Sequence, residues 1–301
     1  MKLSIITINY NNAEGLRKTM ESVLSQTYAN IEHIIIDGAS TDGSVDVIKE
    51  YESQLNITHS TIHLLWSSEP DKGIYNAMNK GIEIALGKRI VNSFNRSELV
   101  EDKNKGIRKA SGEYLLFLNS GDFLISEDVL KKVFENECTA DILCARCNVS
   151  DKGKVVWVSP YIPKATLKDL YFVGLPHQST FIRRSLFEKY GIYREDFRYN
   201  SDIDFWYKTI VLGDATVQGL NLITTDYNLD GLSARDAETQ NYKCEVHEIH
   251  SQGFLSKVLP DYEQWKQERA IFAKYSWIEK HKGLQKMLSL CYKILKHFKR
   301  L

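Results

Sequence analysis

The fold is decided near the N-terminus by the stretch Leu3-Ser4-Ile5-Ile6-Thr7-Ile8 and by a second stretch, Ile31-Glu32-His33-Ile34-Ile35-Ile36. Both are rich in β-branched residues and mostly apolar, which is typical of strands buried on both faces of a sheet. Between them, the segment 14–26 places its apolar residues at helical spacing. A strand, a helix and a second strand joined by short connections predict a pair of parallel strands.

The same alternation continues along the chain. Helices are predicted over 44–51 and from residue 74, and strands over 62–66 and 114–118. Parallel strands that alternate with helices form a sheet that helices cover on both faces. The sequence therefore predicts an α/β fold with a mixed, mainly parallel sheet flanked by helices.

Composition excludes several classes of protein. The chain has 301 residues, and 43% of them are hydrophobic, which is enough for a sizeable core. Basic and acidic residues both number 39, so no overall charge attracts nucleic acid, and no nucleic-acid partner is expected. No apolar run reaches the roughly 18 residues of a membrane-spanning helix, and no signal-peptide pattern opens the chain. A cytoplasmic location is therefore expected.

The five cysteines do not suggest a disulfide framework, because their number is odd and their spacing irregular. Cys144 and Cys147 form a single C-x-x-C pair, and a zinc site would need further ligands from the distant Cys244, His247 and His250. Free thiols are the favoured interpretation, and zinc is the alternative.

Polar residues follow four of the predicted strands, at Asn9, Asp37, Asp71 and Asp122. In sheets of this kind, ligands bind beyond the carboxyl ends of the strands. The chain has neither a P-loop pattern nor a G-x-G-x-x-G after the first strand, so it offers no glycine-rich loop for phosphates. A bound diphosphate would then need a cation, and carboxylates at a strand end suit a hard divalent ion.

Seven motifs follow one another along the chain, at 4–11, 25–28, 37–43, 68–75, 118–122, 176–181 and 199–206. Together they resemble the motifs of the family 2 glycosyltransferases of the GT-A fold, and the resemblance spans roughly residues 2–235. The branch that the chain most resembles makes repeat units of bacterial O-antigen, capsule and other exopolysaccharides. The resemblance implies an inverting transfer of a hexose from a UDP-sugar to a saccharide linked to undecaprenyl diphosphate.

The resemblance also implies which residues bind the donor. The expected nucleotide-sugar contacts are Thr7, Asn9, Asp37, Asp71, Lys72 and Asn119. The acidic metal motif of the family is reduced here to one carboxylate, Asp122, which is expected to hold Mg²⁺ or Mn²⁺ together with the diphosphate and water.

The same match assigns the general base to Asp202, which would take the proton of the acceptor hydroxyl. Asp204 lies two residues later and is expected to support it, and His177 is expected on the acceptor or diphosphate side. A structural interpretation competes with this one, because Asp202 follows Ser201 at a predicted helix start, where an acid stabilises the helix dipole.

A repeat interrupts the resemblance. Asn79-Lys80-Gly81-Ile82 recurs as Asn104-Lys105-Gly106-Ile107, 25 residues later, which indicates a tandem duplication with 79–103 as the inserted copy. One copy is expected to keep the helix of the family, and the segment 98–103 is expected on the surface. The predicted organisation is a GT-A domain over 1–235, with a nucleotide-sugar half at 1–125 and an acceptor half at 126–235.

A helical tail is predicted over 236–301. From residue 280 to the end it carries seven Lys or Arg and no acidic residue, with apolar residues at helical spacing. A basic amphipathic helix of this kind is typical of a membrane-surface element, so peripheral binding to the cytoplasmic face of the inner membrane is expected. Packing against the catalytic domain is the alternative.

Two other functions compete with glycosyl transfer. A nucleotidyltransferase would need a glycine-rich, basic loop after the first strand, and residues 11–15 do not supply one. A non-catalytic binding module of the same fold is disfavoured by Asp122 and Asp202, although the 79–103 insertion leaves that alternative open.

Overall fold

The computed structural model describes residues 1–57, 61–89, 92–94, 112–135, 138–229, 239–279 and 281–298. These divide into two compact units, Met1–Glu245 and Val246–Leu301. The predicted boundary near residue 235 lies outside the described residues and stays a prediction.

One mixed sheet organises the first unit, and in the described part of the chain its strands follow the order β4-β3-β2-β1-β5-β9-β7-β10-β6, with β8 paired to β7. The ladders that join β3, β2, β1 and β5 are parallel, and Asn9 pairs in register with Asp37 at the carboxyl ends of β1 and β2. The strands are β1 (Leu3–Asn9), β2 (Ile31–Asp37), β3 (His63–Ser68), β4 (Asn92–Phe94), β5 (Tyr114–Phe117), β6 (Phe123–Leu124), β7 (Ile142–Asp151), β8 (Lys154–Val158), β9 (Thr180–Arg183) and β10 (Val217–Asn228).

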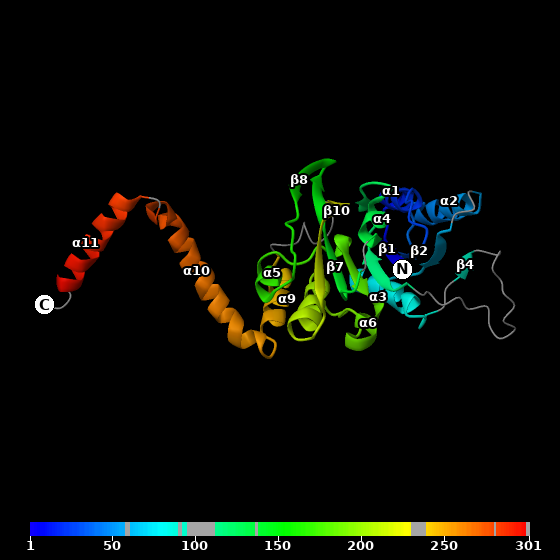
Figure 1. Ribbon diagram of the computed structural model, residues 1–301. Helices are drawn as coiled ribbons and strands as arrows, with labels where there is room; N and C mark the ends of the chain where they lie inside the picture. The colour runs from blue at the N-terminus through cyan, green and yellow to red at the C-terminus, as the bar shows by residue number, and fades with distance from the viewer. Residues whose placement is uncertain are drawn as a thin grey trace. The chain divides into compact units, whose positions relative to one another are not determined.

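Helices cover both faces of this sheet (Figure 1). In the view shown, α1, α2 and α4 lie above β1 and β2, and α3 and α6 lie below them. The helices of the unit are α1 (Ala13–Leu24), α2 (Ser44–Ile57), α3 (Ile74–Ala85), α4 (Val129–Phe134), α5 (Leu167–Phe172), α6 (Arg184–Tyr190) and α7 (Ser201–Trp206), with short turns at His177–Ser179 and Tyr207–Val211. The predicted α/β fold with a mixed sheet is confirmed.

Two contacts explain how the first helices are placed. The Asn12 side chain caps α1 by accepting from the backbone N–H of Gly15 at 3.1 Å, as expected of an N-cap asparagine. Helix α3 approaches β1 closely at Gly81, where a Cβ would lie 2.4 Å from Cγ2 of the buried Ile6. The first copy of the repeat thus forms a helix, as predicted for one of the copies, whereas residues 98–103 and most of the second copy lie outside the described residues.

Three helices continue the chain, namely α9 (Gln240–His250), which spans the boundary of the two units, α10 (Leu255–Glu279) and α11 (Lys282–Phe298). They lie within the segment 236–301, whose assignment as a separate tail stays a prediction. Among the described residues, no helix combines the length and the apolar character that a bilayer crossing requires.

Candidate active site

Asp37 organises the loops at the carboxyl ends of β1, β2 and β3. Its Oδ1 accepts hydrogen bonds from Asn9 Nδ2 at 2.8 Å and Ser40 Oγ at 2.6 Å. Its Oδ2 accepts from the Ser40 backbone N–H at 3.0 Å and from Ser68 Oγ at 2.6 Å. These bonds use the acceptor capacity of the buried carboxylate, so Asp37 holds its neighbours in place. Sequence reasoning found Asp37 and missed Ser40 and Ser68.

Asn9 keeps a free acceptor at the same place. Its Oδ1 is buried and has no hydrogen-bond partner in the described structure. An unpaired buried acceptor costs free energy unless a ligand or water satisfies it. Asn9 is thus equipped to receive an N–H or O–H group from a ligand bound beyond the strand ends.

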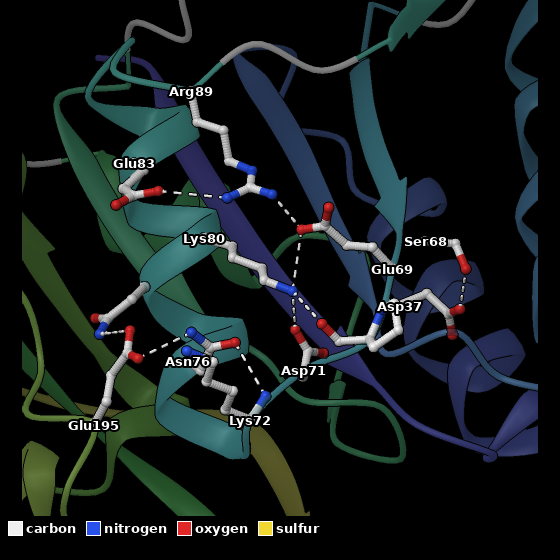
Figure 2. Close-up of polar contacts among 12 residues, drawn as sticks. Asp37, Ser68, Glu69, Asp71, Lys72, Asn76, Lys80, Glu83, Arg89 and Glu195 are labelled. Atoms are coloured by element: carbon white, nitrogen blue, oxygen red, sulfur yellow. Dashed lines mark hydrogen bonds and ion pairs between the residues drawn. The ribbon is translucent and has the colours of Figure 1, made fainter.

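Asp71 lies beside this cluster on the loop between β3 and α3 (Figure 2). It forms an ion pair with Lys80, whose Nζ also donates to the Pro70 carbonyl at 2.9 Å. Its Oδ2 lies 3.0 Å from the position that a Cβ on Gly38 would occupy. Lys72 is exposed on the same loop, and its backbone N–H donates to Asn76 Oδ1 at 3.1 Å.

Thr7 is placed differently from the other predicted donor residues. Its hydroxyl lies 3.0 Å from Nε2 of His33 in the interior, and the other ring nitrogen of His33 lies 3.2 Å from the Tyr51 hydroxyl of α2. Burial lowers the pKa of His33 to about 3, so this ring is neutral. The side chain of Thr7 therefore belongs to the packed face beneath α2, and its predicted contact with a nucleotide stays a prediction.

The loop after β5 carries the predicted metal ligand. The Thr19 hydroxyl of α1 donates to the Asp122 carbonyl at 2.7 Å and accepts from the Gly121 N–H at 3.0 Å, which fixes the loop. Burial raises the pKa of the Asp122 carboxyl to about 7, and the charge of Asp226 adds to the rise. A cation beside Asp122 would relieve this cost, because it stabilises the charged form.

Asn119 lies at the end of the same strand and faces the predicted acceptor side. Its Nδ2 lies 3.3 Å from Nε2 of His177, and its Oδ1 is buried without a partner in the described structure. The other ring nitrogen of His177, Nδ1, lies 3.2 Å from Oδ2 of Asp202. A continuous chain of polar contacts thus joins Asn119, His177 and Asp202.

The Asp202 carboxylate, at the end of this chain of polar contacts, is held by further hydrogen bonds. Its Oδ1 accepts from the Tyr75 hydroxyl at 2.9 Å and from the Ile203 backbone N–H at 3.0 Å. Burial alone would raise the pKa of Asp202, but hydrogen bonding and charge from His177, with the hydrogen bond from Tyr75, lower it below the ordinary 3.8. Asp204 follows on α7 and is 9% exposed.

Helix α3 connects the two sides of the site. Near its start, Tyr75 bonds Asp202, and one turn later Lys80 holds Asp71. Asn79 between them donates to the Tyr193 carbonyl at 2.8 Å and accepts from its backbone N–H at 2.9 Å. Sequence reasoning missed Tyr75 and Lys80. Helix α3 carries polar residues at several positions, and the burial of Asn79 and Lys80, which only the structure shows, distinguishes these two.

Comparison with known proteins identifies the family of this domain. The family model described as Glycosyl transferase family 2 matches residues 4–93, which include the ends of β1, β2 and β3. The chain carries a family 2 glycosyltransferase domain. An uncharacterized glycosyltransferase of Mycobacterium tuberculosis is 31% identical over 221 residues, which are 67% of this chain and 66% of the relative. The chain thus spans about two thirds of the length of that relative.

Solved structures place the domain in the GT-A fold. Staphylococcus aureus TarS 1–349 has a TM-score of 0.55 at 18% identity, over 76% of this chain and 60% of TarS 1–349. The mannosyltransferase PcManGT from Pyrobaculum calidifontis has a TM-score of 0.52 at 14% identity, over 96% of this chain and 83% of its own. The predicted fold class and the predicted enzyme class, a glycosyltransferase domain, are confirmed.

Proposed function

We propose that this protein is an inverting glycosyltransferase that moves a hexose from a UDP-sugar to a saccharide acceptor, with Asp202 as the general base. The observation that carries the proposal is the polar chain from Asn119 through His177 to Asp202, which joins the predicted metal-binding loop to the predicted base. Asp122 is coupled to the same chain by the charge of His177. Donor-side and acceptor-side chemistry then share one end of the sheet.

The reaction is a one-step displacement at the anomeric carbon. The acceptor oxygen forms the new bond as the bond to the diphosphate oxygen breaks, and the acceptor proton passes to Asp202. The lowered pKa of Asp202 keeps this carboxyl ionised at neutral pH and therefore able to accept a proton. His177 and Tyr75 hold its two oxygens, so the base has one orientation.

A UDP-sugar is the donor that we propose to test first. The acceptors Asn9 Oδ1 and Asp71 suit the N–H of uracil or a ribose hydroxyl, and the exposed Lys72 offers a positive charge to phosphate. TarS has been solved in complex with UDP and with UDP-GlcNAc, which supports this choice. PcManGT was solved with GDP-mannose and Mn²⁺, so GDP is the natural comparison nucleotide.

A divalent metal fits the loop after β5. Asp122 is a buried carboxylate and Asn119 Oδ1 is a buried, unpaired oxygen, and both are ligands that Mg²⁺ and Mn²⁺ accept. The described residues contain no group of three or more His, Cys, Asp or Glu that could hold a metal ion, so the diphosphate and water would complete the ligand set. When bound, the metal would stabilise the charge of the departing nucleoside diphosphate.

The acceptor is proposed to be linked to undecaprenyl diphosphate, in surface-polysaccharide synthesis at the cytoplasmic face of the inner membrane. Support comes from α11, where the apolar Met287, Leu288 and Leu290 are 46–59% exposed on a helix that has no acidic residue. Vesicle co-sedimentation tests this part. Lys286→Glu with Lys293→Glu should abolish binding to anionic vesicles, and unchanged sedimentation would contradict it.

Release of UDP from a panel of UDP-sugars, with and without Mn²⁺, tests the activity itself. Wild-type protein should release UDP in the presence of a saccharide acceptor, and Asp202→Asn should lower kcat by roughly 10²- to 10⁴-fold, the usual contribution of a positioned base. Full activity of Asp202→Asn would contradict the assignment. Donor binding without turnover would instead favour a binding module.

A further inference from the structure

Lys80 lies at the centre of a cluster of charged residues on one side of the site (Figure 2). Its side chain is only 10% exposed, and its Nζ contacts Asp71 Oδ1, the Pro70 carbonyl at 2.9 Å and Glu69 Oε1 at 3.0 Å. Burying an ammonium group is costly unless partners surround it. Here the partners are three consecutive residues of one loop, so Lys80 fixes the path of that loop from β3 into α3.

The loop is fixed where it meets the end of β2. One oxygen of Asp71 is bound by Lys80, and the other lies 3.0 Å from the point where a Cβ of Gly38 would be. Gly38 in turn donates its N–H to the Asn9 carbonyl at 2.8 Å. The free oxygen of Asp71 is therefore held against the same strand ends that present Asn9 and Asp37.

The charges around Asp71 depend on Lys80. Burial raises the pKa of Asp71, and the nearby carboxylates of Glu69 and Asp37 add to the rise. Lys80, from α3, opposes it by a hydrogen bond and by its charge. Arg89 binds Glu69 and Glu83, so it neutralises the outer part of the cluster without contacting Asp71.

We propose that Lys80 is a positioning residue for donor recognition, which holds Asp71 as a fixed anionic acceptor for a nucleobase with a ring N–H. This inference rests on the proposed function and extends it to base specificity. Uracil presents such an N–H, whereas the corresponding ring nitrogen of cytosine carries no hydrogen and is itself an acceptor. An anionic Asp71 therefore favours UDP over CDP, and a protonated Asp71 would lose that preference.

The experiment measures dissociation constants of UDP and CDP by calorimetry between pH 6 and 8. Lys80→Met keeps the length of the side chain and removes the charge, and Asp71→Asn removes the carboxylate. Lys80→Met should weaken UDP binding by about tenfold or more, the usual effect of losing a charge-assisted hydrogen bond. It should also lower the preference for UDP over CDP, because Asp71 loses the hydrogen bond and the charge that oppose the rise of its pKa.

A matched control and a double variant separate positioning from general structure. Arg89→Met removes a charge from the same cluster but leaves the contacts of Asp71, so its UDP and CDP affinities should equal those of the wild type. Lys80→Met combined with Asp71→Asn should be no weaker than Asp71→Asn alone, because Lys80 acts through Asp71. Additive effects, or an unchanged UDP preference in Lys80→Met, would overturn the inference.

Carbon NMR titration of the Asp71 carboxyl, assigned by its absence in Asp71→Asn, tests the same inference without any ligand. Lys80→Met should raise the pKa of Asp71, and an unchanged titration would overturn the role of Lys80. A wild-type protein that binds neither UDP nor GDP would instead contradict the proposed function, while the titration would still decide the inference about Lys80.

Discussion

Replacing Tyr75 by phenylalanine removes one hydrogen bond from the proposed base and leaves the ring in place. The Tyr75 hydroxyl lies 2.9 Å from Asp202 Oδ1 and 2.7 Å from the Tyr199 carbonyl, so its single proton is shared between two acceptors. A hydrogen bond to a charged group contributes about 1.5–3 kcal/mol. Because this proton is shared, we expect the lower end of that range, which corresponds to roughly a tenfold higher proton affinity of Asp202.

The direction of the pH effect follows from the requirement that Asp202 be ionised to accept a proton. Asp202 acts as a base above its pKa, and activity is lost as pH falls through that pKa. In the wild type His177 and Tyr75 keep the pKa of Asp202 lowered, so this carboxyl stays ionised at neutral pH. In Tyr75→Phe the pKa rises, and the acidic limb of the pH profile should move toward neutral pH.

Tyr193 provides a matched control. Its ring lies 5.6 Å from that of Tyr75, and its buried hydroxyl has no hydrogen-bond partner in the described structure. Tyr193→Phe removes the same atom from the same region without removing a hydrogen bond to Asp202. The assay is UDP release measured from pH 4.5 to 8.5, and pH profiles of the two variants that superimpose would refute the reasoning.

Three further predictions concern the metal, the packing of α3 and the repeat. Asp122→Ala should abolish the stimulation of UDP release by Mn²⁺, measured as a metal titration, and retained stimulation would place the metal elsewhere. Gly81→Ala should lower the free energy of unfolding in urea, because about 1–3 kcal/mol of overpacking against Ile6 exceeds the roughly 1 kcal/mol of helix propensity gained. Deleting residues 88–112 joins Gly87 to Glu113 and should leave a folded protein that binds UDP; circular dichroism and calorimetry check this, and an unfolded product would contradict the duplication.

Local sequence predicted four strands, which the structure shows as β1, β2, β3 and β5, and it predicted none of the other six described strands. Runs rich in β-branched residues predicted strands at 3–8 and 31–36, and the structure extends each by one residue, to Asn9 and Asp37. The alternation within a strand also explains Thr7. It lies on the same face as Leu3 and Ile5, so its side chain packs beneath α2, whereas the family resemblance alone made it a donor contact.

The partners of the site residues could not be predicted in the same way. Asp202, His177 and Asn119 were each expected in the site, but their contacts span 25 and 58 residues of sequence, and the contact of Tyr75 with Asp202 spans 127. No local pattern carries that information. A polar residue in a helix becomes informative once its burial is known: the Lys80 side chain is only 10% exposed, and its ammonium group is paired with the Asp71 carboxylate.

Two glycines of the repeat, Gly81 in the first copy and Gly112 in the second, lie against β1. The first copy supplies α3, with Lys80 on Asp71 and Gly81 against Ile6. The second copy ends at Gly112, where a Cβ would lie 2.1 Å from Ser4 Oγ, so its last residue provides the close approach to β1 that leads into β5. Both glycines therefore bring the chain against β1, one before and one after the part of the repeat that lies outside the described residues.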